Sequence, residues 1–466
     1  MKSYQFDPNH YQKLLQIVGP DHIVIHDDIP MDLTHDELKT VSAKPDYHVS
    51  VTTKEQVEAI MVFANQNRIP VTTRGSGTGL VGGCVPIQGG ILLDLSQMNR
   101  ILELDPINLT LRVEPGVLLL DIYEYVEKQG LFYAPDPGEK TATIAGNIST
   151  NAGGMRAVKY GVTRDWVRGL EVVIPTGERL VLGGKVVKNS TGFALKDLII
   201  GSEGTLGVIV EATLKLMAKP QKTMSLLVPF ETHKKAIDAA PYLLTHHVVP
   251  SAIEFFNQES LTYGEAFLGK KIPNHHHEAY LLLSYDGNSD THLMEDIEKA
   301  SALCLDELGA LDVYLVDTEE RKKSVWTVRG AFLEAIKSST TEMDECDVVL
   351  PRSMIASYLD FVQALSQEIG IRIPYFGHIG DGNLHLYLCK DALDDETWQD
   401  KKTIAFDHMY QKANACGGLV SGEHGIGYAK KRYMKAQLGD KQIDIMRAIK
   451  KAFDPNGILN PEKIID

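Results

Sequence analysis

The chain has 466 residues, of which 44% are hydrophobic and 23% charged, and its formal net charge is −15. This is the composition of an ordinary globular protein that is long enough for two or three domains. The negative charge argues against nucleic acid as a partner, because phosphate binding requires a basic surface. The five cysteines are scattered and form no CxxC pair, which favours a reducing compartment over a disulfide framework.

Residues 1–43 predict a short helical lead-in. The opening stretch, MKSYQFDPNHYQKLLQIVGPDHIV, has no apolar core followed by small residues and therefore does not resemble a secretory signal. No apolar run approaches the roughly 20 residues that span a bilayer. We expect a cytoplasmic protein without a transmembrane segment, and attachment at the inner face of the membrane stays open.

Residues 44–219 predict an α+β domain built around glycine-rich loops. A helical pattern, TKEQVEAIMVFANQNR, precedes the strand IPVTTRG. Three stretches rich in Gly, Ser, Thr and Asn follow: TTRGSGTGLVGG, PDPGEKTATIAGNISTNAGG and LIIGSEGTLGVIV. Glycines this dense let backbone N–H groups approach an anion such as a diphosphate, because no Cβ intervenes. A loop of tight turns would explain the first stretch alone, but three such loops favour a long ligand bound through backbone contacts.

Residues 220–418 predict a substrate or cap domain. Its first half has the order β-α-β-β-α-β, and a similar order recurs after the helical stretch VWTVRGAFLEAIK, ending in the strand GLVSG. This predicts a large antiparallel sheet covered by helices, in two ferredoxin-like halves. Residues 419–466 predict a segment that carries a metal and base loop, followed by two helical stretches and a Pro/Asn/Gly turn.

The stretch GHIGDGNLH, residues 377–385, predicts a β-hairpin with two histidines. With Asp381–Gly382 as a two-residue type I′ turn, His378 pairs directly with His385 and both imidazoles lie on one face. Two imidazoles and a carboxylate suit Zn, Mn or Fe, and Glu423 in SGEHGIG is the candidate carboxylate. The alternatives are two hydrogen-bonded strand histidines and a solvated loop carboxylate.

Together, the three loops and the histidine motif resemble the PCMH-type FAD-binding flavoproteins of the vanillyl-alcohol-oxidase superfamily. Within it, the chain resembles the FAD-linked glycolate oxidase and D-lactate dehydrogenase family, to which D-2-hydroxyglutarate dehydrogenase is also similar. The resemblance implies a PCMH-type FAD-binding domain, and FAD bound non-covalently because residues 71–90 contain no histidine. The residues that it assigns to FAD are Arg74, Gly75, Ser76, Gly77, Thr78, Gly79, Leu80, Pro135, Gly138, Thr143, Gly146, Asn147, Ser149, Asn151, Gly153, Gly204, Gly207, Ile209 and Asn460.

The resemblance also implies a metal-dependent chemistry. It makes His378, His385 and Glu423 the ligands of a divalent metal (Zn, Mn or Fe) and His424 the catalytic base. It places Asn383 near the substrate or the metal, and Arg329 at the substrate carboxylate, although Arg329 alone could be a helix-surface arginine. The implied reaction is the oxidation of a small 2-hydroxy acid to the 2-oxo acid, with hydride passing from Cα to flavin N5.

Substrate and partners follow less directly. Dicarboxylate-specific relatives carry a lysine where this chain has Glu345, which favours D-lactate or glycolate as substrate. A D-2-hydroxyglutarate dehydrogenase and a flavoprotein subunit of a larger glycolate oxidase complex are the alternatives. An ether-lipid-type flavoenzyme would not use this metal motif, and a non-catalytic electron-relay subunit would have lost it. The electron acceptor would be a quinone, an electron-transfer protein or an iron–sulfur subunit, and a homodimer stays open.

Overall fold

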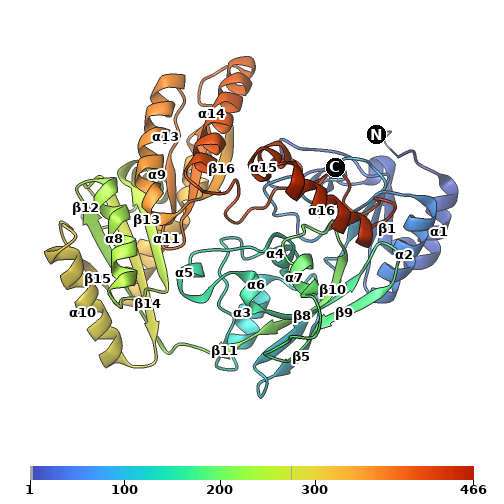
Figure 1. Ribbon diagram of the computed structural model, residues 1–466, viewed down its shortest axis with the longest axis horizontal. Helices are drawn as coiled ribbons and strands as arrows, with labels where there is room; N and C mark the ends of the chain where they lie inside the picture. Colours follow the sequence, from blue (N-terminus) through green and yellow to red (C-terminus); the bar gives the residue numbers. More distant parts are fainter. Residues whose placement is uncertain (1–3, 274, 466) are drawn as a thin grey trace. The chain divides into compact units, whose positions relative to one another are not determined.

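The computed structural model describes residues 4–273 and 275–465, and its chain divides into two compact units (Figure 1). The first unit comprises the chain up to Ala152, then Val162–Lys219, and the chain from His424 onward. The second comprises Gly153–Gly161 and Pro220–Glu423. The second unit therefore extends beyond the predicted boundary at residue 418 and takes in a short stretch of the predicted FAD-binding domain. Residues 1–3 and 466 of the predicted end segments lie outside the described residues.

The lead-in is only partly helical. Its helix is followed by short 3₁₀ turns and by a strand that joins a sheet, because the apolar run after Asp21 pairs with β2. The elements are α1 (Pro8–Val18), η1 (Pro20–His22), β1 (Ile23–Ile25), η2 (His26–Asp28) and η3 (Met31–Leu33).

The first unit contains two main sheets among the residues that are described. One has the order β1-β2-β4-β3, with β2, β4 and β3 parallel, and the other has the antiparallel order β5-β6-β10-β8-β9. A two-stranded pair, β7–β11, lies apart. The strands are β2 (Tyr47–Ser50), β3 (Val71–Arg74), β4 (Ile91–Asp94), β5 (Ile101–Asp105), β6 (Thr110–Val113), β7 (Leu131–Phe132), β8 (Val167–Val173), β9 (Arg179–Gly183), β10 (Val208–Lys215) and β11 (Met217–Ala218).

Helix α2 (Lys54–Asn67) connects the two sheets, as the sequence pattern predicts for a helix before β3. It begins with a capping box in which Thr53 and Gln56 satisfy each other's backbone N–H groups. Its buried side chains, such as Ile60, share one hydrophobic core with strands β2–β4 and with Val208 of β10. The remaining helices of this unit are α3 (Leu119–Glu127), α4 (Ile144–Thr150), α6 (Thr163–Trp166), α7 (Leu195–Ile199), α15 (Lys431–Leu438) and α16 (Asp440–Phe453).

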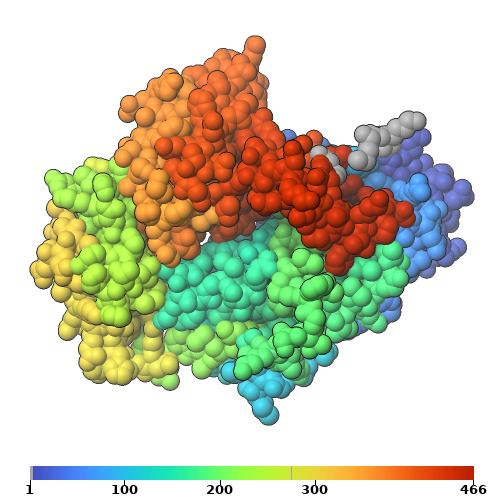
Figure 2. Space-filling model, viewed as in Figure 1, coloured from blue at the N-terminus to red at the C-terminus, as the bar shows by residue number. Residues whose placement is uncertain are grey.

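The C-terminal segment returns to the first sheet. Its two helices, α15 and α16, were predicted from the sequence and lie at the surface in Figure 2. The chain then runs alongside β3, where Val71 donates to the carbonyl of Ile458 at 2.8 Å and Asn460 donates to the carbonyl of Val71 at 2.7 Å. The last residues therefore extend this sheet next to the glycine-rich loop that follows β3.

Within the described part of the second unit, all seven strands form one antiparallel sheet of order β15-β12-β14-β13-β17-β18-β16. The first four have the strand order of a ferredoxin-like half, and the last three repeat it in mirror order. The predicted large sheet is confirmed. Its strands are β12 (Lys222–Phe230), β13 (Ala252–Asn257), β14 (Ala279–Gly287), β15 (Tyr314–Val316), β16 (Met343–Val349), β17 (Tyr375–His378) and β18 (Asn383–Cys389).

Two local predictions in this unit are wrong. The stretch GLVSG does not form a strand but makes one isolated bridge, between Leu419 and Val349, because the chain turns away at once. An unpredicted helix, α9, lies between β13 and β14. The helices and the 3₁₀ turn are α5 (Ala157–Tyr160), α8 (His233–Thr245), α9 (Gln258–Leu268), α10 (Asp290–Asp306), α11 (Glu319–Gly330), α12 (Phe332–Ser338), η4 (Arg352–Met354), α13 (Ile355–Ile369) and α14 (Asp395–Ala415).

One face of this sheet carries both an apolar core and the predicted metal residues. Helices α9, α11 and α12 pack on it through a cluster that includes Phe332 of α12, Phe256 of β13 and Phe376 of β17. Side chains two positions apart in a strand share a face, so Glu254 and His378 project on the same side as Phe256 and Phe376. Polar groups at this edge of the core are therefore buried.

Among the helices of the described residues, none combines the length and the apolar character that are needed to span a membrane.

Candidate active site

The histidine hairpin forms, but its predicted register is wrong. His378 pairs with Asn383, and His385 pairs with Phe376. The connection has four residues rather than two, because the N–H groups of Asp381 and Gly382 both bond to the carbonyl of His378 at 3.1 Å. The two histidines are thus diagonal neighbours on one face, with ring centroids 5.2 Å apart. The conclusion that both imidazoles share a face holds, since the shift moves the pairing by an even number of positions.

Glu423 completes the group that the sequence predicts as metal ligands. Its Oε1 atom lies 3.8 Å from Nε2 of His378 and 3.4 Å from Nε2 of His385. One ligand atom from each of the three residues fits within 4.8 Å of the others. Both histidines are buried, with 8% and 5% of their surface exposed, so the site is sheltered from water.

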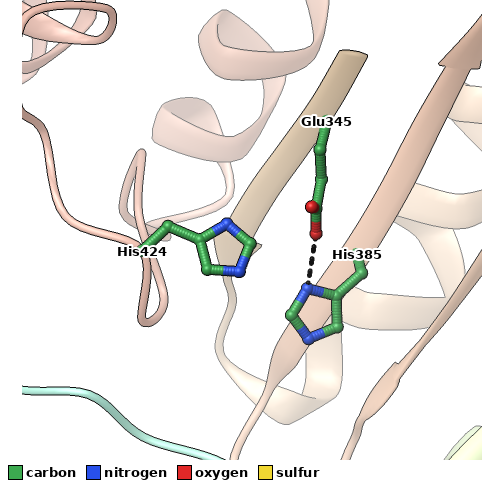
Figure 3. Close-up of side chains that lie close together, drawn as sticks. All are labelled: Glu345, His385 and His424. Carbon is green, nitrogen blue, oxygen red and sulfur yellow. Dashed lines mark hydrogen bonds and ion pairs between the residues drawn. The ribbon is translucent and has the colours of Figure 1, made fainter. Parts of the chain in front are cut away.

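The outer nitrogen of each imidazole is held by a carboxylate. Nδ1 of His378 donates to Oε1 of Glu254 at 2.6 Å, and Nδ1 of His385 donates to Oε1 of Glu345 at 2.9 Å (Figure 3). These bonds leave both Nε2 atoms directed toward Glu423. Metal-binding histidines usually have such a carboxylate behind them, because it fixes the tautomer and the ring orientation.

The electrostatics of this cluster favour a positive charge between the rings. Burial alone would lower the pKa of His378, but the carboxylates of Glu254 and Glu423 raise this pKa well above its ordinary value. For His385, Glu345 and Glu423 likewise outweigh burial and raise the pKa. A proton or a divalent cation can supply that charge. The donor set, two imidazole nitrogens and one carboxylate oxygen, fits Zn, Mn or Fe.

Asp347 holds the turn that presents Glu423. Its carboxylate accepts hydrogen bonds from the hydroxyl of Ser421 at 2.9 Å, the N–H of Gly422 at 3.0 Å and the N–H of Glu423 at 3.1 Å. The amide nitrogen of Asn383 donates to the same carboxylate at 2.7 Å. Because the amide nitrogen is used in this way, the predicted contact of Asn383 with substrate or metal would be made by its amide oxygen.

Arg329, the predicted substrate arginine, is buried in the same network. It projects from α11, and its guanidinium lies 4.4 Å from the centroid of the Phe376 ring. Nε and Nη2 donate to Oε2 of Glu254 at 2.8 and 2.5 Å, which leaves Nη1 as the remaining donor nitrogen. Burial alone would raise the pKa of Glu254, but His378 and Arg329 hold it below its ordinary value. Glu254 is therefore ionised between them.

The sequence interpretation missed two residues of this network. Glu254 stands in the apolar strand SAIEFFN, and Asp347 begins the run DVVLP. Both are 0% exposed. Ionised side chains are almost never fully buried unless they are paired, so a carboxylate inside an apolar strand is the signal that could have found them.

The predicted base, His424, directly follows Glu423 and begins the C-terminal segment of the first unit. The backbone just beyond it is anchored by Glu203, whose carboxylate accepts from the N–H groups of Ile426 and Gly427, both at 2.7 Å. Burial raises the pKa of Glu203 from its ordinary 4.5 to about 7. This carboxylate was also not predicted as a site residue.

The predicted FAD loops of the first unit meet one another. A Cβ on Gly75 would collide with Oγ1 of Thr143, and a Cβ on Gly204 would lie 2.7 Å from Nδ2 of Asn460. The N–H of Glu203 donates to the carbonyl of Ser149 at 2.8 Å. Residues from all three glycine-rich stretches and the C-terminal tail thus converge, which requires glycine at the points of closest approach.

Two predicted FAD residues use their side chains to hold the loops. Arg74 donates to the carbonyls of His35 and Asp32 at 2.9 and 2.8 Å. Asn460 accepts from the N–H of Thr73 at 2.9 Å and donates to the carbonyl of Glu203 at 2.8 Å. These side chains fix the loop geometry. A cofactor would therefore be contacted by their remaining atoms or by the backbone.

Asn147 shows that this region fits a cofactor. It is 5% exposed, and within the described residues its buried amide nitrogen has no hydrogen-bond partner. An unpaired buried donor costs about 1–3 kcal/mol, so an acceptor on a bound ligand would stabilise it. Gly138 faces open space, as a cofactor-lining residue would.

The other predicted FAD residues have varied surroundings. Gly207 packs against the side chain of Val172, and Ile209 is buried in β10, so both also have structural roles. Gly153 belongs to the stretch 153–161 of the second unit. The remaining ones lie in or next to the loops already described: Ser76, Gly77, Thr78, Gly79, Leu80, Pro135, Gly146 and Asn151.

Comparison with known proteins decides the family. Residues 219–464 match the C-terminal domain of FAD linked oxidases, and residues 45–183 match an FAD binding domain. The chain belongs to the FAD-linked oxidases. It is 46% identical to a D-lactate dehydrogenase of Anaerostipes hadrus, over 100% of this chain and 99% of the relative. It is 37% identical to the glycolate oxidase subunit GlcD of Bacillus subtilis (strain 168), over 97% and 96%.

The fold of this FAD-linked oxidase is that of the PCMH-type flavoproteins. A crystal structure of p-cresol methylhydroxylase with substrate bound superimposes with a TM-score of 0.83 at 17% identity, covering 100% of this chain and 99% of the other. The predicted fold class and family are confirmed. The protein is an FAD-linked oxidoreductase of the D-lactate dehydrogenase and glycolate oxidase type.

Proposed function

We propose that this oxidoreductase oxidises a small 2-hydroxy monocarboxylic acid, D-lactate or glycolate, to the 2-oxo acid, with a divalent metal ion bound by His378, His385 and Glu423. One observation carries the proposal: two imidazole Nε2 atoms face one carboxylate, and each Nδ1 is held by a further carboxylate. This arrangement of donors is typical of a metal site and not of two isolated strand histidines.

The reaction removes a proton from the substrate hydroxyl and a hydride from Cα. When bound, FAD supplies the two-electron acceptor, and the metal ion supplies positive charge beside the ionising hydroxyl. His424 takes the hydroxyl proton on an imidazole nitrogen, a role that histidine often fills in general-base catalysis. Nη1 of Arg329 binds the substrate carboxylate, and Asn383 contacts the substrate or the metal through its amide oxygen.

The preference for a small monocarboxylate rests on charge. Glu345 and Glu254 bring negative charge to the outer nitrogens of the two histidines, while Arg329 and the proposed metal ion bring positive charge for one substrate carboxylate. A second carboxylate near Glu345 would be repelled. The similarity to a D-lactate dehydrogenase and to a glycolate oxidase subunit supports the same substrates. The electron acceptor would be a quinone, an electron-transfer protein or an iron–sulfur subunit, with a homodimer or a larger complex as the assembly.

An anaerobic flavin-bleaching screen tests the proposal. Purified protein should be yellow, release intact FAD on denaturation, and bleach with D-lactate or glycolate in preference to L-lactate and D-2-hydroxyglutarate. Elemental analysis of protein prepared without chelator should find one divalent metal ion per chain. Bleaching by D-2-hydroxyglutarate alone would replace the proposed substrate class.

Variants at the hairpin separate metal from flavin. His378→Ala and His385→Ala should abolish turnover and metal binding while FAD stays bound, whereas replacement of the exposed His292 of α10 should change none of these. Wild-type protein that contains no metal, and whose activity survives a chelator, would contradict the metal assignment.

A further inference from the structure

Glu254 connects two parts of the proposed site. It lies in β13, its side chain is 0% exposed, and each of its oxygens serves a different residue. Oε1 accepts from Nδ1 of His378 at 2.6 Å. Oε2 accepts from Nε and Nη2 of Arg329 at 2.8 and 2.5 Å. The metal-ligand histidine and the arginine are therefore held by opposite ends of one carboxylate.

We propose that Glu254 is a positioning residue that couples metal binding at His378 to substrate binding at Arg329. The inference rests on the proposed roles of those two residues. Through Oε1, Glu254 keeps the Nδ1–H tautomer of His378, so that the Nε2 lone pair faces Glu423 and can bind a cation. Through Oε2, it fixes one edge of the guanidinium, which leaves Nη1 for a substrate carboxylate.

The surroundings prevent other groups from replacing this carboxylate. Phe256 of the same strand and Phe376 of the neighbouring strand are both buried, and the Phe376 ring lies 4.4 Å from the guanidinium. Water cannot reach a side chain with no exposed surface, so a lost hydrogen bond at Glu254 leaves a buried polar group unpaired. If a side chain with fewer acceptor atoms replaced Glu254, it could therefore accept hydrogen bonds from His378 or from Arg329, but not from both.

Glu254→Gln exploits this competition, because an amide has one acceptor oxygen where the carboxylate has two. Its NH₂ group would face either the Nδ1–H of His378 or the N–H groups of Arg329, and two donors cannot pair. We expect metal affinity, measured by chelator competition, to fall about 10–100-fold. The Kd of the product 2-oxo acid, measured by the change in flavin absorbance, should rise in the same variant.

A second substitution tests the coupling itself. In Glu254→Gln/Arg329→Met the amide oxygen is free to serve His378. Metal affinity should then return to within a few-fold of that of Arg329→Met alone, while product binding stays weak. A purely structural role predicts a lower melting temperature, unchanged binding constants at Glu254→Gln, and no rescue by the second substitution.

Controls keep the two proposals apart. Glu265→Gln replaces another buried carboxylate of this unit, one that accepts from the N–H of Ile272, and should leave both constants unchanged. If Glu254→Gln does not fold, Glu254→Asp keeps both oxygens at a shorter reach and should weaken both kinds of binding to a smaller degree.

If the wild-type protein is found to contain no metal, the proposed function is contradicted. Wild-type protein with metal, and unchanged constants in the Glu254 variants, contradicts only the coupling.

Discussion

In the first unit, the side chains of Arg74 and Asn460 hold the glycine-rich loops together, and glycine is required where two loops approach each other. In the second unit, the imidazoles of His378 and His385 are themselves the proposed ligands, and buried carboxylates hold them. The close approach of the loops depends on the absence of a Cβ, whereas the proposed metal site depends above all on particular side-chain atoms. Glycines beside the metal site are also closely packed, since a Cβ on Gly422 would collide with Nδ2 of Asn383. An added methyl group should therefore harm the first site, and a change of chemical group at a histidine or carboxylate should harm the second.

The largest expected effect concerns the proposed base. His424→Ala should lower kcat by about 10²–10⁴-fold, because general-base catalysis typically contributes that much. Metal content, FAD content and the Kd of the product 2-oxo acid should be close to wild type. Turnover near the wild-type rate in a variant that keeps metal and FAD would show that another group takes the proton of the substrate hydroxyl.

An added methyl group at a loop contact should have the next largest effect. The Cβ of Gly75→Ala would collide with Oγ1 of Thr143, and overpacking typically costs about 1–3 kcal/mol. If this cost falls on the FAD-binding conformation, the Kd of FAD should rise roughly 5- to 150-fold, measured by titrating apoprotein. Thr143→Ala in the same background should restore part of the affinity.

Gly287→Ala is the matched control for this substitution, because its Cβ would meet nothing within 4 Å and Gly287 ends β14 of the second unit, outside the predicted FAD residues. Its FAD affinity should stay near wild type. Equal FAD affinity in Gly75→Ala and wild type would show that the loops can move apart at no cost.

The next prediction concerns substrate choice in the second unit. Glu345→Gln keeps an acceptor for Nδ1 of His385 but removes the negative charge. The ratio of kcat/KM for D-2-hydroxyglutarate to that for D-lactate should rise by roughly tenfold, because repulsion of a second carboxylate is lost. Glu345→Lys should increase the ratio further, with weaker metal binding, since lysine offers no acceptor to His385. An unchanged ratio in Glu345→Gln would place this carboxylate away from the substrate.

The last prediction concerns stability and not activity, and it is a pH dependence. Because burial raises the pKa of Glu203 from 4.5 to about 7, the folded protein retains a proton that the unfolded chain releases. The contribution of Glu203 to stability should therefore fall as pH rises from about 4.5 to 7, by up to about 1.4 kcal/mol per pH unit. Above pH 7 it should be constant.

Glu203→Gln removes this titration. The unfolding free energy of wild-type and variant apoprotein can be measured by denaturant at pH 5.5, 6.5 and 8. The value for the wild type minus the value for the variant should decrease as pH rises to 7. A difference that does not change with pH would mean that Glu203 is ionised throughout this range.

The parts of the second unit differ in how far they could be predicted. The large antiparallel sheet and the hairpin were predicted because alternating apolar residues and the turn residues Asp-Gly are local signals, but the sheet has seven strands because the predicted strand GLVSG does not form. Two predictions from local patterns were wrong: a strand was predicted at GLVSG and does not form, and helix α9 was not predicted. Short apolar runs can take more than one structure, which explains both errors. Glu254 and Asp347 were missed because their partners are distant in sequence: Glu254 and His378, for example, are 124 positions apart.

The sequence by itself determined the family, the three glycine-rich loops, and the histidines and glutamate of the proposed metal site, because each lies in a short motif with a characteristic spacing. Only the tertiary structure decided the register of the hairpin, which depends on hydrogen bonds within the turn and on packing at both strands. It also decided which carboxylates stand behind His378 and His385, and that Arg329 shares Glu254 with His378. Those contacts join strands and helices far apart in the chain, and their geometry follows from burial on one face of a single sheet.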